Sequence, residues 1–506
     1  MKNSWKQVEL RELVQSVIGG DWGKAPDYED PEFVDVLCIR GTELRNWHEE
    51  RGLSAAPRKI KKNSLVKRAL NEGDIVLEVS GGGPEQPVGR LELIDKQSLA
   101  HNPEIPRVCT NFFRRVVLVD GIDPAYVVWF LKFFYSTGEI REYQAGSNNL
   151  RNLIYPKYET ISFPLAPLNE QQRIVEKIET LFARLDKGEE AVRDVQKLLT
   201  RYRQSVLKSA VTGQLTADWR SERVDQLEHG RDLLQRGLKL RKDKWKGRYK
   251  YKEPVPPVVD GMPDLPEGWE WVSPHQMSKP EDNSLCIGPF GSNLKVEDYR
   301  DEGVPLVFVR HIRAKNFNGL NPKFIDESKT AELASHHVFP GDLLITKMGE
   351  PPGDVCIYPD DQPLAVITAD CIRFAAFEPI VDKFFLEVVI GSPVVQAQIK
   401  KIAKGVAQQK VTLANFKQIA LPFPSLDEQL EIASLVDDAM SKTAVLEEWC
   451  ETELKRSASL RQSILKDAFA GKLVPQDPTD EPASALLARI AAEKPTAKKT
   501  RRKTSA

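Results

Sequence analysis

The feature that most constrains this chain is a long stretch that occurs twice. Residues 164–216 and 422–474 align without a gap at a constant offset of 258 residues, the difference between positions 428 and 170. Identical residues lie at both ends of the copies, and Glu170-Gln171 aligns with Glu428-Gln429 at the start. A period this long is not that of a solenoid, whose repeats run about 20–50 residues. We therefore expect a tandem duplication with pseudo-twofold organisation.

Each copy has the pattern of a long helix. After a proline-rich start, apolar residues follow at helical spacing. The first copy keeps a seven-residue period from Leu185, with Val195 and Tyr202 in the row between, which is typical of a coiled-coil seam. About 27 residues would form a rod of roughly 40 Å. Gly213 and Gly471 are expected to end the helices as left-handed caps.

The second copy is less regular, so the two helices could pair with each other rather than with identical partners. For one copy taken alone, an ordinary bundle helix is the alternative interpretation. The scaffold positions that we assign to these helices are Glu170, Gln171, Leu185, Val192, Leu199, Tyr202, Val206, Glu428, Gln429, Leu446, Leu460 and Ile464.

The regions before each copy read as globular units of similar order. Residues 33–39, 73–79 and 114–119 are β-rich runs bounded by turn residues, and residues 125–135 suit a short buried helix. In the second region, 341–345 matches 73–77, 368–373 lies opposite 110–115, and Val309-Arg310 resembles Ile39-Arg40. The scaffold copies are alike whereas the globular copies differ, which indicates one task performed on two different targets.

The segment 217–262 follows the first scaffold copy. It has an amphipathic middle and then a run at 241–252 in which basic residues alternate with Trp245, Tyr249 and Tyr251. Its counterpart after the second copy is 483–492, followed by a basic tail at 498–503. Such tracts are usually solvated or disordered, but the interleaved aromatic rings also favour contact with nucleic acid.

Composition gives no sign of a membrane, a metal site or a secreted protein. The formal net charge is −1, which alone indicates no polyanionic partner. The six cysteines show no CxxC spacing, so neither a zinc site nor a disulfide framework is expected. There is no apolar signal core at the start and no uninterrupted 18-residue apolar run. We expect a cytoplasmic protein.

Catalytic motifs were sought without success. Residues 20–25 resemble a phosphate-binding loop only superficially, because the first glycine would fall on Ile18 and the hydroxyl position holds Ala25. Glu327-Ser328-Lys329 could end a metal-dependent nuclease pattern, but no convincing acidic residue lies on a preceding strand to share the metal. Asn102-Pro103-Glu104 is not the loop with which adenine methyltransferases hold a flipped base. We assign no catalytic residue, metal ligand or cofactor to this chain.

Features that suit DNA are clearer. Residues 57–68 carry six basic side chains and no acid, a local charge suited to phosphates. Arg, Asn and Gln elsewhere have the donors that read guanine and adenine edges, and the glycines at 81–83 allow close approach of the backbone, although a mobile surface loop is the alternative. The candidate DNA-binding residues are Arg40, Arg45, Arg58, Lys59, Lys61, Lys62, Ser80, Gly81, Gly82, Arg90, Asn111, Arg114, Asn148, Asn149, Arg310, His311, Arg313, Lys347, Gln408, Gln409 and Lys410.

These motifs resemble a known family. Pro-Leu-x-Glu-Gln before a helix, closed by Arg-Gln-Ser-(Val/Ile)-Leu-Lys-x-Ala-(Val/Phe)-x-Gly-x-Leu and present twice, with Leu-Pro-x-Gly-Trp-x-Trp from Leu265 opening the second half, is similar to the specificity subunit of type I restriction-modification enzymes. The resemblance covers essentially the whole chain. Ala166-Pro167, where the second copy has Pro424-Ser425, is a minor departure.

The resemblance implies an α+β protein with two α/β target recognition domains, separated by two conserved helical regions that form an antiparallel coiled coil. The implied divisions are 1–163 and 263–421 for the recognition domains, and 164–262 and 422–506 for the helical regions with linker and basic tail. The chain would recognise a bipartite asymmetric double-stranded DNA site.

The resemblance also implies partners. Two modification subunits would bind S-adenosylmethionine and methylate adenine, and restriction subunits would add ATP- and Mg²⁺-dependent translocation and cleavage. Two other classes stay open at this point: a stand-alone nuclease or methyltransferase, which the missing motifs argue against, and a coiled-coil adaptor that joins two protein partners.

Overall fold

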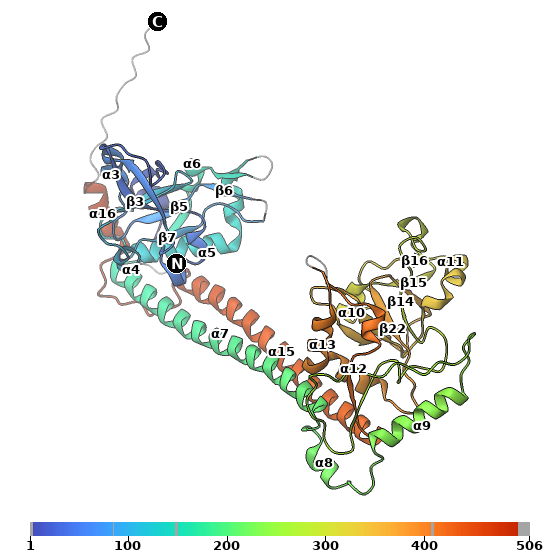
Figure 1. The fold of residues 1–506 in the computed structure, drawn as a ribbon. Coiled ribbons are helices and arrows are strands. Elements are labelled where there is room, and N and C mark those ends of the chain that lie inside the picture. The colour runs from blue at the N-terminus through green and yellow to red at the C-terminus, as the bar shows by residue number, and fades with distance from the viewer. Residues whose placement is uncertain (1–3, 84, 147–149, 406–408, 494–506) are drawn as a thin grey trace. The chain divides into compact units, whose positions relative to one another are not determined.

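The computed structural model describes residues 4–83, 85–146, 150–405 and 409–493. The chain forms two compact units (Figure 1). Unit 1 comprises Met1–Val192 and Thr452–Ala506, and unit 2 comprises Arg193–Glu451. The two long helices α7 (Leu168–Val211) and α15 (Leu426–Phe469) therefore each contribute one part to either unit.

Unit 1 is built around small, mostly antiparallel sheets. One sheet has the order β2(Val14–Gly19)-β9(Phe113–Leu118)-β5(Ile75–Glu78)-β7(Leu91–Leu93), and another β4(Ala56–Lys61)-β3(Phe33–Ile39)-β8(Arg107–Cys109), in which β3 and β8 are parallel. The others are β10(Gln144–Ala145)-β11(Arg151–Leu153)-β6(Ser80–Gly82) and β1(Lys6–Glu9)-β12(Ser162–Leu165). The helices are α1(Leu10–Leu13), η1(Glu43–Arg45), α2(Trp47–Glu50), α3(Lys62–Arg68), α4(Lys96–Ala100), α5(Pro124–Thr137), η2(Glu139–Tyr143), α6(Tyr155–Tyr158) and α16(Ala483–Glu493).

Unit 2 repeats this arrangement. Its sheets are β14(Leu285–Ile287)-β22(Cys371–Phe374)-β18(Leu343–Thr346)-β20(Val355–Ile357), β16(Phe324–Ile325)-β15(Val304–Val307)-β21(Ala365–Ile367)-β17(His337–Val338), β19(Met348–Gly349)-β23(Gln409–Lys410) and β13(Glu270–Val272)-β24(Leu421–Phe423). The helices are α8(Ala217–Ser221), α9(Gly230–Asp243), η3(Val296–Asp298), α10(Val309–Ala314), α11(Glu327–Glu332), η4(Ala334–His336), α12(Lys383–Gly391), α13(Pro393–Ile402) and α14(Leu413–Phe416).

A buried ion pair recurs in the central sheet of each unit. Arg115 Nε donates to Asp74 at 2.6 Å, and Arg373 Nε donates to Asp342 at the same distance. The two carboxylates are 4% and 1% exposed. These contacts confirm the sequence alignment of 341–345 with 73–77 and of 368–373 with 110–115.

The expected match of Ile39-Arg40 with Val309-Arg310 is wrong by two residues. The Thr110 amide donates to the Ile39 carbonyl and the Thr368 amide to the Val307 carbonyl, both at 3.0 Å, so Ile39 corresponds to Val307. Arg40 consequently follows a strand, whereas Arg310 lies within α10. Matching the two similar dipeptides gave the wrong correspondence because the segments before them differ in length.

Each long helix is anchored to its own unit by a matched pair of bonds at its start. Trp5 Nε1 donates to Glu170 and Trp269 Nε1 donates to Glu428, both at 2.9 Å. Both glutamates are buried, with 1% exposure. This explains why Glu170 and Glu428 stand in the repeated motif.

The neighbouring glutamines form a second matched contact. Gln171 accepts from the Asp123 amide and Gln429 accepts from the Asp382 amide, both at 3.0 Å. Asp123 and Asp382 cap α5 and α12, so each scaffold helix holds the start of its unit's apolar helix. The helix at 125–135 is thus buried as expected, and no helix among the described residues has the length and hydropathy to cross a bilayer.

The long helices pair antiparallel within each unit. In unit 1, Arg461 of α15 donates to Asp186 at 2.5 Å and to Glu189 at 3.0 Å of α7. In unit 2, Arg203 of α7 pairs with Glu447 of α15 at 2.9 Å. Both helices are continuous and longer than the expected 27 residues, and both end shortly before Gly213 and Gly471, where φ is +70° and +69°.

The seam between the helices differs in part from expectation. In α7, Leu199 and Val206 are buried and Leu185 packs against the unit 1 core, as the seven-residue period predicts. The expected Tyr202, Leu446 and Leu460 are instead 51%, 47% and 43% exposed. The expected Ile464 packs against the unit 1 core. Three small residues seven apart, Thr443, Cys450 and Ser457, are buried in the middle of α15. Thr443 and Ser457 were not expected there, because their side chains are small and polar.

Candidate nucleic-acid interface

Several candidate residues lie at one end of the sheet β2-β9-β5-β7 in unit 1 and of its counterpart β14-β22-β18-β20 in unit 2. Because neighbouring strands are antiparallel, the end of β2, the start of β9 and the end of β5 meet at the same edge. Asn111 and Ser80 lie there in unit 1. In unit 2 the same edge carries Lys347, which follows β18.

A glycine fixes the loop after the first strand at this edge. The Gly20 amide donates to the Phe113 carbonyl at 3.0 Å, and the Gly288 amide donates to the Cys371 carbonyl at 3.2 Å. A Cβ on either glycine would lie 2.1 Å from the carbonyl oxygen of Thr110 or Thr368. No side chain fits at either position, so both loops are held closely against the threonine turn.

A short strand pair lies beside this edge in each unit. In unit 1, β6 pairs with β11, and Ser80 Oγ donates to Asn152 at 2.6 Å. Gly81 is exposed with φ +105°, and Gly82 is buried. In unit 2, β19 pairs with β23, which carries Gln409 and Lys410. The predicted contacts Asn148, Asn149 and Gln408 lie outside the described residues.

The basic segment 57–68 borders a hollow of about 370 Å³. Lys61 and Asn111 line this hollow together with residues 20–24. Lys61 and Lys62 are exposed, whereas Lys59 pairs with Asp35 at 3.4 Å. The structure therefore brings a predicted lysine and a predicted amide into one concave surface. The sequence did not indicate that residues 20–24 belong to it.

Several predicted arginines of unit 1 have partners within the protein. Arg40 donates to the buried Glu43 at 2.6 Å, and Arg90 donates to the buried Glu78 at 2.8 and 2.5 Å. Hydrogen bonding to these carboxylates raises the pKa of both guanidinium groups. Arg114 lies 4.5 Å from the Tyr155 ring, Arg58 donates to the Trp22 carbonyl at 3.0 Å, and Arg45 is exposed.

The predicted DNA-binding residues of α10 in unit 2 mostly form contacts with loops of the protein itself. His311 is 2% exposed and contacts the Leu320 carbonyl, and burial lowers its pKa, so the ring is uncharged at neutral pH. Arg310 Nε donates to the same carbonyl at 3.0 Å. Arg313 pairs with Asp354 at 2.8 Å but is exposed beside β19. Lys347 Nζ donates to the Ala369 carbonyl at 2.7 Å. DNA contact by these residues stays a prediction.

The aromatic residues of the basic linker have a packing role. The guanidinium of Arg241, itself 2% exposed, lies 5.7 Å from the Trp245 ring and 5.8 Å from the Tyr251 ring. Tyr249 is 71% exposed. Two of the three rings thus hold the linker to α9 rather than face solvent.

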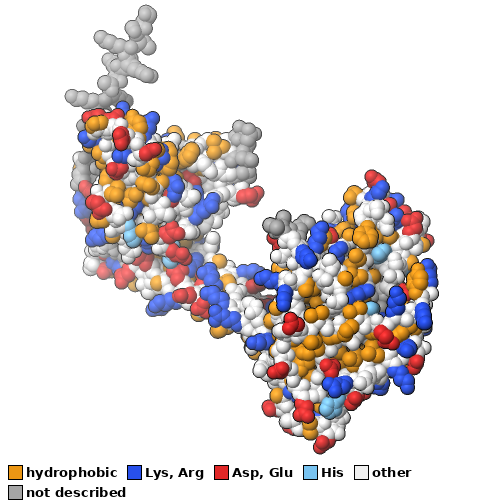
Figure 2. Space-filling model, in the orientation of Figure 1, with side chains coloured by type: hydrophobic (Ala, Val, Ile, Leu, Met, Phe, Trp, Pro, Cys, Tyr) orange, Lys and Arg blue, Asp and Glu red, His pale blue; other side chains and the backbone are white. Residues whose placement is uncertain are grey.

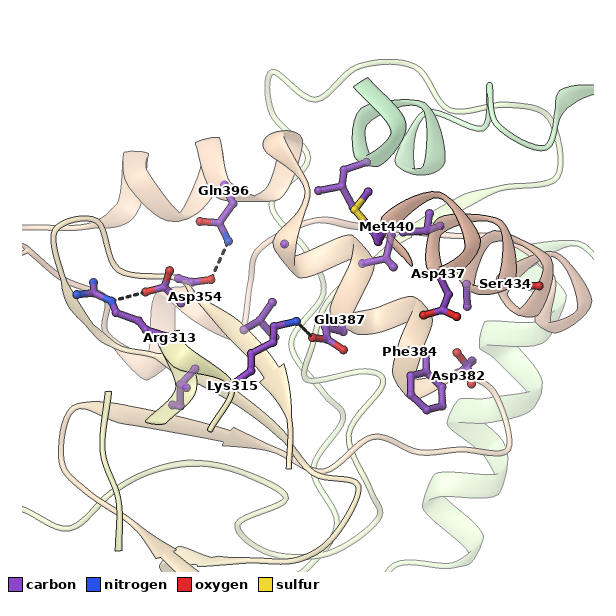
Figure 3. A pocket seen from close by; sticks show the side chains of 18 of the residues that line it. Arg313, Lys315, Asp354, Asp382, Phe384, Glu387, Gln396, Ser434, Asp437 and Met440 are labelled. Atoms are coloured by element: carbon purple, nitrogen blue, oxygen red, sulfur yellow. Dashed lines mark hydrogen bonds and ion pairs between the residues drawn. The ribbon is translucent and has the colours of Figure 1, made fainter. Parts of the chain in front are cut away.

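A second kind of site is a cleft between the apolar helix and the scaffold helix of each unit. Both clefts have a volume of about 760 Å³. In unit 2, α12 contributes Phe384 and α15 contributes Met440, while ion pairs Arg313–Asp354 and Lys315–Glu387 form one wall (Figure 3). The unit 1 cleft lies between the corresponding helices, with Trp129 of α5 and Phe182 of α7 in its lining.

Charge and metal-ligand chemistry are unremarkable on the visible surface. Lys and Arg are interspersed with Asp and Glu over both units in the view of Figure 2, consistent with the net charge of −1. Across the part of the chain that the structure describes, no three His, Cys, Asp or Glu side chains gather as a metal site. All six cysteines are buried and free, and burial raises the pKa of the Cys38 and Cys371 thiols to about 12.

Comparison with known proteins gives a consistent result. The family model "Type I restriction modification DNA specificity domain" matches residues 312–456. The specificity subunit of the type I restriction enzyme StySPI of Salmonella potsdam is 24% identical over 99% of this chain and 98% of its own length. That of EcoKI from Escherichia coli K12 is 24% identical over 93% and 91%. That of EcoBI from Escherichia coli is 27% identical, and the alignment covers 65% of this chain and 64% of that relative.

Two solved structures share the fold. The HsdS subunit from Thermoanaerobacter tengcongensis aligns over 93% of this chain and 98% of its own, with a TM-score of 0.52 and 17% identity. A chain from a study of complex assembly and conformational transition of the type I R-M system aligns over 93% and 99%, with a TM-score of 0.59 and 17% identity.

Proposed function

We propose that this chain belongs to the type I restriction-modification specificity subunits. Each of its two units reads one half of a bipartite, asymmetric double-stranded DNA site. The recognition domains are the regions 1–163 and 263–421. The chain is a DNA-recognition component, and the chemistry resides in partner subunits.

The observation that carries this proposal is a repeated frame with a different surface in each unit. Buried anchors such as Trp5–Glu170 and Trp269–Glu428 are matched in the two units, whereas the side chains at the equivalent sheet edges differ. A frame that stays the same while the surface changes suits two readers of different sequences. Arg, Lys, Asn and Gln at these edges have the donors for base and phosphate contacts.

Binding of the purified chain with its modification subunits to duplex DNA tests the proposal. We expect salt-dependent binding to one bipartite duplex, and much weaker binding when either half is scrambled. Equal binding to both scrambled duplexes would favour a protein adaptor instead.

We propose that two modification subunits dock on the chain, one at each cleft. The two clefts lie on equivalent elements and have the same volume, so they suit two copies of one partner. The modification subunits supply S-adenosylmethionine binding and adenine methylation, and restriction subunits supply ATP- and Mg²⁺-dependent cleavage. The chain's own contribution is to place these partners on a chosen DNA site.

Replacing Phe384 by aspartate is expected to impair docking at the unit 2 cleft. Phe384 is 54% exposed, so the change places a charge where an apolar partner surface must be buried without disturbing the core. We expect at least about 30-fold weaker binding of one of the two modification subunits, measured by native mass spectrometry. Val296→Asp is the control, because this side chain is 78% exposed on η3 and does not line the cleft. Equal assembly of the two variants would exclude the cleft.

We propose further that the paired helices set the spacing between the two half-sites. Each helix passes from one unit into the other, and helix length is fixed at about 1.5 Å per residue. If the two helices fix the spacing of the units, a longer helix would require a longer DNA spacer between the half-sites.

An insertion of four residues after Leu199 tests the spacing. It adds about 6 Å of helix, comparable to nearly two base-pair steps of ~3.4 Å, and rotates the seam by about 40°. We expect a preferred spacer longer by one or two base pairs, with both half-sequences unchanged and somewhat lower affinity. The same insertion after Gln226, outside both long helices, should leave the spacer unchanged. A Leu199 variant that folds, assembles and keeps the original spacer would place the spacing in the partners.

A further inference from the structure

Two loops place an aromatic ring at the same point of the candidate interface. Gly20-Asp21-Trp22-Gly23 follows β2, and Gly288-Pro289-Phe290-Gly291 follows β14. The rings lie two residues after the glycine that packs against the threonine carbonyl in each unit. The loops otherwise differ, since Lys24 corresponds to Ser292. An aromatic residue is therefore common to two loops that have diverged around it.

Both rings are accessible, and each lies on a loop held by hydrogen bonds. Trp22 is 36% exposed and Phe290 is 71% exposed. Single exposed apolar residues are common on protein surfaces, but here an exposed aromatic ring recurs at equivalent positions. The Arg58 guanidinium lies 4.2 Å from the Trp22 ring, and the Asn293 amide donates to the Phe290 carbonyl at 2.8 Å. Each loop thus presents its ring from a fixed backbone.

The surroundings of both rings suit a polyanion with flat faces. Trp22 lines the hollow that also contains Lys61 and Asn111. Phe290 lies on the loop whose glycine packs against the Thr368–Ala369 turn, and the ammonium of Lys347 donates to the Ala369 carbonyl. Lysines next to an aromatic ring combine contact with phosphates and stacking on bases.

We propose that Trp22 and Phe290 contact DNA, each inserting at one base step of the half-site that its unit reads and stacking on the base face that the opened step exposes. An inserted ring needs no hydrogen bond to a base, so an aromatic ring can serve in both units although the sequences they read differ. The donors around each ring then supply the sequence preference. This inference rests on the proposed function. It adds a contact that is made by an aromatic ring, and in unit 2 that ring, Phe290, has no hydrogen-bond donor.

The test uses the full chain assembled with its modification subunits and a duplex carrying the bipartite site. Phe290→Ala and Trp22→Ala are each expected to weaken binding by about 5- to 100-fold. Phe290→Tyr and Trp22→Phe, which keep a ring, should bind within about threefold of the wild type. Phe339→Ala is the control, because it removes a half-exposed ring near the opposite end of the unit 2 sheet.

Fluorescence of 2-aminopurine, placed at successive positions of each half-site other than the methylated adenine, shows which base step is opened. Neighbouring bases already quench the probe in a free duplex, so the wild-type complex should raise its emission at one position per half-site, and the alanine variant of that unit should abolish this rise. The rise in the other half-site should stay unchanged, which also shows that the variant is folded.

The outcomes separate the two claims. If wild-type complex binds no bipartite duplex, the proposed function fails. If it binds, and Phe290→Ala and Trp22→Ala bind as tightly as wild type with the same rise in emission, only the stacking inference fails. Loss of modification-subunit assembly in either variant, with DNA affinity per assembled complex unchanged, would overturn stacking and assign the rings to a protein interface.

Discussion

Replacing residues 1–163 by the corresponding region of a relative is expected to change one half of the recognised sequence and leave the other half intact. The region has two apolar clusters of its own, and it packs on the scaffold through a third, shared cluster and through Trp5–Glu170 and Gln171–Asp123, polar contacts that recur in unit 2. Each mismatched base pair costs about 1–3 kcal/mol. Loss of two or three contacted pairs should therefore weaken binding to the old half-site by at least about 100-fold.

Selection from a duplex library that is randomised in both half-sites measures this result. The matched exchange of 263–421 is the reciprocal control and should change only the other half. If either exchange alters both half-sites together, the units are not independent readers. The comparison requires that the exchanged chain still folds. The thermal unfolding transition of the unit that was not replaced should therefore be unchanged.

Replacing Asp342 by alanine is expected to destabilise unit 2 by about 3–5 kcal/mol, because it leaves the Arg373 guanidinium buried without its carboxylate. Arg373 is 6% exposed in the pair, and its Nε lies 2.6 Å from Asp342. The measurement is the free energy of unfolding by urea, followed with a probe in unit 2 since the chain has two units. Asp360→Ala is the control: Asp360 is 76% exposed and pairs with Lys383 at 3.3 Å, so it should change stability by about 0.5 kcal/mol or less.

The equivalent change in unit 1 is Asp74→Ala, which removes the partner of Arg115. It should destabilise unit 1 and leave the unit 2 transition in place. A loss of less than about 1 kcal/mol in both variants would show that the buried pairs do not hold the sheets together.

Much of the frame could be predicted because its signals are local. The glycines at 213 and 471 end the helices through left-handed φ values, and a β-branched run gave the strand at 33–39 with its observed bounds. Thr443 and Ser457 of α15 were not predicted because they are small and polar, and a seven-residue period of such residues is inconspicuous in a sequence. Ile39 corresponds to Val307, two residues before the expected Val309. This correspondence depends on pairing with distant strands, which a local sequence match cannot supply.

The candidate interface was harder to predict because residue type does not show where a side chain is directed. Arg40 and Arg90 have the donors of a base reader, but Glu43 and Glu78 bind their guanidinium groups. His311 is buried, in a position equivalent to that of Glu43. Trp22 and Phe290 were missed because donors were sought, and because loops of different length removed these two rings from the constant offset of the scaffold.

The central claim is that the two units read two separate halves of one DNA site, and mapping methylated adenines in the host genome tests it most directly. The account predicts a motif with two short, unlike specific sequences separated by a spacer of fixed length, with methylation lost when the chain is deleted. One uninterrupted methylated motif that depends on this chain, or two half-sequences that occur at any spacing, would contradict it.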